Sequence, residues 1–265
     1  MSPTCLRRSA RWLRPSLAGQ SIWRRSMSKS TKAVCALAAL LALLVWPLWA
    51  TATTQAEPGQ KELEALLVKV GRNYAKTQSL ECNFRQKSRT GGRVREGRGK
   101  AFFFRPTSTG DSVIRWEYAL PVVQTIVNDG REIRIYTPVD RQMLVSPAAG
   151  ADTDMAYALF TGKSTLTATF TVAPGDPDFQ LDPAPAGLQA LVLVPKNPQS
   201  QLKRAQIWLN REARIERILM EDHFEALTEL SFDGMRFDSI RPSDTARIAE
   251  LRSITTPADT QIIRQ

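Results

Sequence analysis

The chain of 265 residues is poor in histidine and cysteine, with one histidine and three cysteines. A single imidazole, that of His223, cannot build a zinc centre that needs two, and it makes a histidine-based catalytic site improbable. Cys5 and Cys35 lie within the first 56 residues, so Cys82 has no cysteine partner for an internal disulfide after that point. The composition therefore excludes histidine-rich metal sites and a disulfide framework.

Acidic residues are missing from the first 56 positions, whereas eight of the 36 Lys and Arg residues lie there. The remaining 209 residues hold 28 basic and 26 acidic residues, which is a net charge of about +2. A groove that binds nucleic-acid phosphates needs clustered excess basic charge. The overall charge of +10 therefore does not indicate a nucleic-acid partner.

The acid-free segment has the layout of a secretory signal. An apolar stretch covers residues 33–49, with basic residues before it and small residues after it. We expect residues 1–56 to be a signal peptide that is cleaved near 52–56, and residues 57–265 to form a single exported domain. A retained membrane anchor and a twin-arginine signal are the alternatives. Because Cys35 lies near the start of the apolar stretch rather than after it, we expect no lipid anchor.

The apolar pattern after this segment changes from helical to alternating spacing. The first apolar positions share one face of an amphipathic helix: Leu63, Leu66, Leu67, Val70 and Tyr74. From Ser79 to Phe232 about ten short runs alternate with period two, with turn signals such as Gly91-Gly92 between them. A second short helix is expected over 152–160, followed by a strand over 165–172. The pattern predicts a mainly β domain, with one strongly curved or barrel-like antiparallel sheet covered by two helices.

Sequence motifs of enzymes are missing from this pattern. We find no nucleophile elbow, Walker loop or dinucleotide-binding loop. His223 is expected at the surface or in a turn, and Cys82 as a small buried side chain. The protein is therefore predicted to bind rather than to catalyse. All ten Phe residues lie after position 56, beside Trp116 and Trp208, and they either line an apolar cavity or form the core.

Several short motifs follow one another in order between residues 63 and 263. They are Phe84-x-Gln86, Glu96-Gly97-x-Gly99, Arg105-Pro106, Arg115-Trp116-Glu117-Tyr118-x-x-Pro121, Gln124–Gly130, Ile135-Tyr136-x-Pro138, Gln142, Ala158–Gly162 and Thr256–Ile263. This ordered set resembles the outer-membrane lipoprotein carrier protein family (LolA). The resemblance implies an incomplete antiparallel β-barrel with helices as a lid, and it implies no cofactor or metal.

The resemblance also implies a function and a set of site residues. The implied function is that of a periplasmic chaperone, monomeric, that takes acylated lipoproteins from an inner-membrane lipoprotein-releasing ABC transporter to an outer-membrane lipoprotein receptor. Arg105 corresponds to an arginine that bonds to the lid and holds it closed. The implied acyl-binding residues lie on the two lid helices and on the strands: Tyr74, Leu159, Phe160, Phe84, Ile114 and Trp116.

Residues 107–113 make a longer connection than the family pattern has, which leaves Arg115 as an alternative to Arg105 for the lid contact. Phe84, Ile114 and Trp116 could equally serve core packing alone. Three other functions remain open: a lipoprotein-sensing barrel domain of an envelope-stress regulator, the outer-membrane receptor of the same pathway, and a secreted hydrolase.

Overall fold

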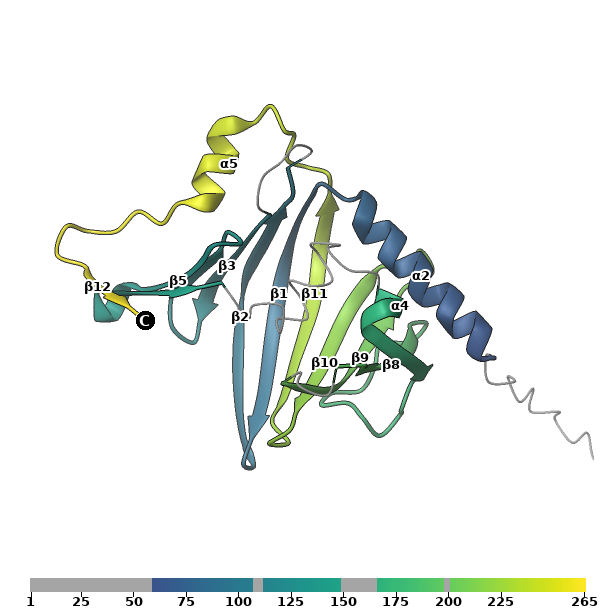
Figure 1. The fold of residues 1–265 in the computed structure, drawn as a ribbon. Coiled ribbons are helices and arrows are strands. Elements are labelled where there is room, and N and C mark those ends of the chain that lie inside the picture. The colour runs from purple at the N-terminus through teal and green to yellow at the C-terminus, as the bar shows by residue number, and fades with distance from the viewer. Residues whose placement is uncertain (1–58, 107–111, 149–165, 198–200) are drawn as a thin grey trace, which may run out of the picture. The chain divides into compact units, whose positions relative to one another are not determined.

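The computed structural model describes residues 59–106, 112–148, 166–197 and 201–265 (Figure 1). The expected signal peptide and the expected helix over 152–160, with Leu159 and Phe160, lie outside the described residues.

One sheet of twelve strands dominates the described part of the chain. Its strands are β1 (Ser79–Thr90), β2 (Arg93–Phe104), β3 (Val113–Leu120), β4 (Gln124–Asn128), β5 (Glu132–Thr137), β6 (Gln142–Pro147), β7 (Phe170–Pro174), β8 (Gln189–Pro195), β9 (Leu202–Leu209), β10 (Ile215–Asp222), β11 (Leu227–Phe237) and β12 (Gln261–Arg264). The helices are α2 (Gln60–Lys76), α4 (Leu166–Thr169) and α5 (Thr245–Arg252), with a 3-10 turn at Pro138–Asp140.

The strand order is β12-β6-β5-β4-β3-β2-β1-β11-β10-β9-β8-β7, so the sheet is open, with β12 and β7 at its edges. All neighbours pair antiparallel except β12, which runs parallel to β6. The long hairpin of β1 and β2 lies in the middle, with Ser79 opposite Phe104 and Thr90 opposite Arg93. The predicted mainly β, curved antiparallel sheet with few helices is confirmed.

Helix α2 packs its apolar stripe against one face of the sheet, which we call the α2 face. Leu63, Leu67, Val70 and Tyr74 are buried there, and Leu66 is half-buried, as the helical spacing predicted. The strands contribute their alternate side chains to the same cluster, since successive residues of a strand point to opposite faces. We call this set the α2 cluster; its strand members include Leu80, Phe84, Phe103, Ile114, Trp116, Ile207, Ile218 and Phe232.

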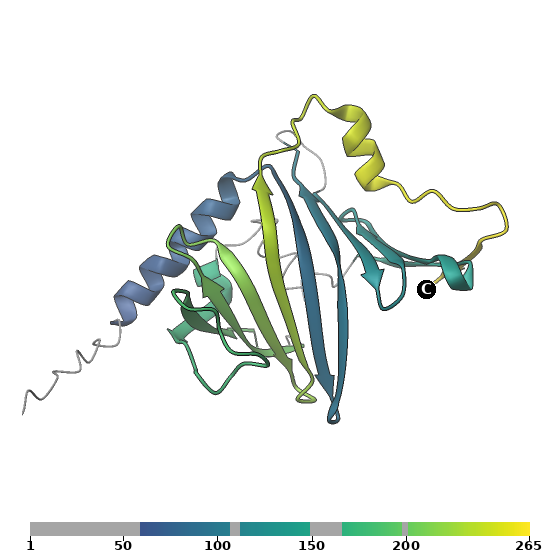
Figure 2. The same ribbon diagram turned by 180° about the vertical axis from the view of Figure 1, so that it is seen from behind.

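The opposite face, which we call the α5 face, has two smaller apolar clusters. Helix α5 lies against β3 and β4 (Figure 2). Its Leu251 belongs to one cluster with Phe102, Phe104, Val113 and Val127. The loop before β8 covers Trp208, Leu219 and Leu227 with Phe179. Both faces of the sheet are therefore buried in part, so its strands carry apolar residues at consecutive positions as well as alternate ones.

Two local predictions need correction. The strand expected over 165–172 begins only at Phe170, because Leu166–Thr169 forms the short helix α4. Helix α5 was not predicted, since it has few apolar residues and buries Leu251 alone. The closing strand expected from the Thr256–Ile263 motif is present as β12, and it pairs in parallel rather than antiparallel.

Replacement of glycine by alanine is expected to have opposite effects on stability at two positions. A Cβ atom on Gly99 in β2 would lie 1.9 Å from the backbone oxygen of Glu117, whereas a Cβ atom on Gly71 in α2 would make ordinary contact with Leu166 at 3.9 Å. We expect Gly99→Ala to lower the free energy of unfolding by roughly 1–3 kcal/mol. Gly71→Ala should raise it by up to about 1 kcal/mol, because alanine favours helix. Denaturant unfolding measures both, and equal midpoints would contradict the structure.

Candidate functional site

The last turn of α2 is held to the sheet by Arg105, the residue that follows β2. Its Nη2 shares two hydrogens among three carbonyl oxygens, those of Tyr74 at 2.7 Å, Ala75 at 3.0 Å and Thr77 at 2.5 Å. The last carbonyls of a helix have no partner within the helix, and a cation there also complements the helix dipole. Burial lowers the pKa of the Arg105 guanidinium, and nearby Asp238 opposes that shift, so the group stays charged at neutral pH.

The backbone between α2 and β1 is bonded on its other side by Asp238. Its Oδ1 accepts hydrogen bonds from the backbone N–H of Gln78 at 2.7 Å and of Ser79 at 3.3 Å. The N–H of Arg105 donates to the carbonyl of Gln78 at 2.7 Å. This junction therefore has a cation on its carbonyls and a carboxylate on its N–H groups, and we call it the α2 junction.

Helix α2 is also bonded to the turn between β9 and β10. Asn73 donates from Nδ2 to the carbonyl of Glu212 at 2.8 Å, and the N–H of Ile215 donates to Tyr74 Oη at 3.0 Å. At the other end of the helix, Gln60 donates to the carbonyl of Val172 at 3.3 Å. Lifting α2 from the sheet breaks these bonds as well as those of Arg105.

The alternative residue, Arg115, contacts the other helix. Its Nη1 donates to the carbonyl of Ser253 at 2.6 Å, just after α5, and its Nε to Glu117 at 2.6 Å. Arg134 donates to the carbonyl of Arg252 at 2.8 Å in the same place. The two candidate arginines thus each bond the C-terminal end of a helix, Arg105 on α2 and Arg115 on α5.

The other described site residues come together in the α2 cluster. Tyr74, Phe84, Ile114 and Trp116 are at most 8% exposed. The ring of Phe84 meets that of Trp116 edge-on, with centroids 4.9 Å apart, and that of Tyr118 in the same way at 4.8 Å. These residues form one apolar layer beneath α2, so a ligand reaches them only if the packing over them opens.

Buried ionisable groups in this layer are neutral at physiological pH. Burial raises the pKa of the Tyr74 phenol and raises the pKa of the Cys82 thiol to about 12. The expectation that Cys82 is buried is confirmed. A layer without ionised groups suits an apolar ligand such as an acyl chain.

Not every aromatic residue faces this layer. Phe102, Phe104, Phe179 and Trp208 belong to the clusters on the α5 face, and Phe224 is exposed. The hypothesis that the aromatic residues jointly line a cavity is therefore wrong for these five. Alternation along a strand places Phe102, Phe104 and Trp208 on the far face of the sheet, whereas Phe179 and Phe224 lie outside the strands.

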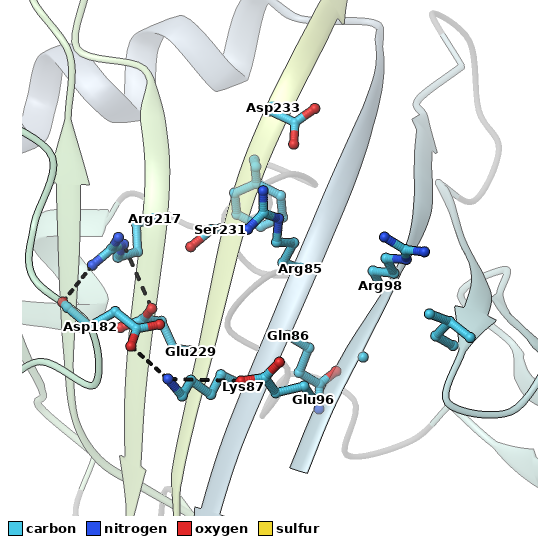
Figure 3. Close-up of a pocket in the computed structure, with 13 residues that line it drawn as sticks. Arg85, Gln86, Lys87, Glu96, Arg98, Asp182, Arg217, Glu229, Ser231 and Asp233 are labelled. Carbon is cyan, nitrogen blue, oxygen red and sulfur yellow. Dashed lines mark hydrogen bonds and ion pairs between the residues drawn. The ribbon is translucent and has the colours of Figure 1, made fainter. Parts of the chain in front are cut away.

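A charged pocket of about 690 Å³ lies on the α5 face (Figure 3). Lys87 Nζ pairs with Asp182 Oδ1 at 2.6 Å, and Arg217 Nη1 donates to the carbonyl of Asp182 at 2.9 Å. Arg217 Nε lies 3.7 Å from Glu229 Oε1. With the hydrogen bond from the Leu181 N–H to Glu229 Oε2 at 3.4 Å, these contacts fasten the loop before β8 to β1, β10 and β11. The sequence did not reveal this structural role.

The described residues hold no candidate metal centre. Within them, no group of three His, Cys, Asp or Glu side chains could hold a metal ion. His223 is exposed in the turn between β10 and β11, as expected. None of the helices that the structure describes is both long and apolar enough to cross a membrane.

Comparison with known sequences identifies the family. The chain matches the family described as "Outer membrane lipoprotein carrier protein LolA" over residues 75–244, more than half of its length. The chain belongs to this family, as the ordered motifs indicated. The match begins at the end of α2 and includes Arg105, Phe84, Ile114 and Trp116.

Individual relatives are distant. A protein of Methylobacillus flagellatus named outer-membrane lipoprotein carrier protein is 25% identical over 165 residues, which cover 62% of this chain and 74% of the relative. One with the same name from Xanthomonas axonopodis pv. citri is 26% identical over 152 residues, 56% of this chain and 68% of the relative. Among solved structures, an uncharacterized conserved protein from Thermus thermophilus superimposes with a TM-score of 0.46 at 14% identity, covering 77% of this chain and 99% of that one.

The charged pocket predicts a pH dependence of stability. Burial raises the pKa of Glu229, and the charge of Arg217 only partly offsets this. A carboxyl whose native pKa is raised above its unfolded value of about 4.3 stabilises the fold at low pH, and this contribution is lost as pH rises through the native pKa.

We therefore expect the free energy of unfolding of the wild type to fall relative to that of Glu229→Gln between about pH 4 and pH 7. Urea unfolding of both proteins across this range measures the difference. Parallel pH profiles would show that Glu229 has its ordinary pKa in the folded protein.

Proposed function

We propose that the protein is a periplasmic carrier that binds the acyl chains of lipoproteins beneath α2 and passes them on toward the outer membrane. The family supports this role, as do the names of the two relatives. The cargo would arrive from an inner-membrane lipoprotein-releasing transporter and leave to an outer-membrane receptor. Residues 1–56 would direct export and be cleaved.

The observation that carries the proposal is the contact of Arg105 with the end of α2, above a layer of neutral apolar side chains. A carrier needs an apolar surface that is covered when empty and exposed when loaded. In this protein α2 is the cover, and its removal would expose the α2 cluster. The charged contact that holds α2 at the α2 junction is that of Arg105.

The energetics suit a reversible carrier. A single myristoyl chain partitions into a membrane with a constant of about 10⁴ M⁻¹, or roughly 5–6 kcal/mol. A carrier must offset part of this free energy and still release its cargo. Opening α2 costs the bonds of Arg105, each worth roughly 1.5–3 kcal/mol when one partner is charged. This cost lowers the net affinity for acyl chains and so favours onward transfer.

Replacing Arg105 tests the proposal. Arg105→Leu removes stabilisation from the closed, empty state and leaves the loaded state unchanged, so cargo binding should tighten by at least roughly 10- to 150-fold, which is the equivalent of one such bond. The variant should accumulate as a complex with lipoprotein, and transfer to an outer-membrane receptor should slow. Pull-down of lipoprotein with the variant and a transfer assay measure both effects.

Arg115→Leu is the matched control, because it removes an equivalent guanidinium contact at the end of α5 rather than α2. We expect its cargo affinity to stay at the wild-type value. If Arg105→Leu and Arg115→Leu bind and transfer the same amount of lipoprotein per folded molecule, Arg105 stabilises the fold and does not control the opening of α2. If Arg115→Leu alone alters transfer, α5 rather than α2 is the mobile cover.

A further inference from the structure

Two neighbouring hairpins end together at the far end of the sheet from the α2 junction (Figures 1 and 2). The β1–β2 hairpin turns at Gly91-Gly92, and the β10–β11 hairpin turns at residues 223–226. Strand β1 pairs with β11 up to this end, where Arg89 lies opposite Leu227. Both turns line one pocket of about 430 Å³, so they form a continuous surface.

The second hairpin presents an aromatic side chain to solvent. Phe224 is 91% exposed. Its turn is well bonded, since Asp222 Oδ1 accepts the backbone N–H of Phe224 at 2.8 Å and of Ala226 at 2.9 Å. The ring therefore projects from a fixed turn. On the neighbouring hairpin, Val94 lies opposite Arg89 and is 53% exposed. Apolar side chains that are exposed at the end of a hairpin do not stabilise the core of the fold. They can be buried instead in the apolar region of another structure, such as a lipid layer.

The first hairpin is strongly basic. Between residues 85 and 98 it carries six cations, Arg85, Lys87, Arg89, Arg93, Arg95 and Arg98, and one acidic residue, Glu96. The net charge of about +2 over residues 57–265 does not reveal this local excess of positive charge. Lys87 is paired with Asp182. The exposed acids near the two tips are Glu96, Asp178 and Glu225, fewer than the cations.

These cations lie on both faces of the hairpin. Arg93 and Arg95 are opposite Thr90 and Ser88 and so lie on the α2 face, whereas Arg89 alternates with them and lies on the α5 face. A flat protein surface would pair with the cations of one face and leave those of the other unused. A layer of anionic headgroups surrounds the whole tip, and apolar side chains at its end enter the acyl boundary below.

We propose that this tip surface, formed by Arg89, Arg93, Arg95, Val94 and Phe224, docks on an anionic lipid surface. The arginines contribute through charge, at roughly fivefold in affinity for each cation near the surface, and the two apolar side chains through burial. This inference goes beyond the proposed carrier function, because docking needs neither cargo nor movement of α2.

Vesicle binding tests the proposal with the empty protein. The probes are vesicles of phosphatidylcholine mixed with phosphatidylglycerol, and vesicles of phosphatidylcholine alone. We expect sedimentation with the anionic vesicles at about 0.01 M salt and its loss at about 1 M, where the Debye length falls from about 30 to about 3 Å. The double variant Arg93→Ser/Arg95→Ser should bind roughly thirtyfold more weakly, and Phe224→Ser roughly tenfold more weakly.

Lys61→Ser/Lys69→Ser is the matched control, because it removes the same net charge from exposed positions on α2. It should bind as the wild type does, and thermal unfolding should show that all variants remain folded. Equal losses in the two double variants would mean that net charge alone matters, which overturns a defined tip surface. Absence of binding to anionic vesicles also overturns the proposal and leaves an acidic protein as the occupant.

Discussion

The contact of Arg105 with the last turn of α2 is the interaction on which the arrangement of the site depends. One guanidinium bonds the carbonyls of Tyr74, Ala75 and Thr77, which have few other partners at a helix end. Asp238 bonds the N–H groups that follow. The helix leaves this junction in a fixed direction, and its apolar stripe then lies on the α2 cluster. The polar contact at this end and the burial of the stripe therefore hold α2 in the same position.

The same kind of contact is found on the α5 face, where Arg115 and Arg134 donate hydrogen bonds to the backbone carbonyls at the end of α5. Sequence alone left Arg105 and Arg115 as alternatives, because each belongs to a motif of the family and the connection between them is long. The pairing of the strands separates them. Arg105 follows β2 where Phe104 lies opposite Ser79, next to the end of α2. Arg115 lies within β3 and shares the α5 face with Val113.

Much of the fold could be predicted because the periodic signals are long. The stripe of α2 spans three turns, and the strands from β1 to β11 alternate over many residues. Prediction failed where the signal was short or where burial on both faces obscured it. Phe102, Phe103 and Phe104 are consecutive and all buried, so period two does not reveal which faces α2. Leu166–Thr169 reads as a strand by alternation, yet it forms the helical turn that packs against α2.

Strand β1 connects the two surfaces to which we assign roles. It begins at Ser79 beside the α2 junction and ends at Thr90 beside the hairpin tips, a length of 12 residues or about 36 Å. A lipid surface at the tips would therefore leave the junction clear, and α2 could move while the tips stay docked. The pairing of β1 with β2 is regular over its whole length, whereas its pairing with β11 shifts register between Glu81 and Asn83, near the α2 junction. No described contact joins α2 to the tips directly, so we expect docking and opening to be separate events.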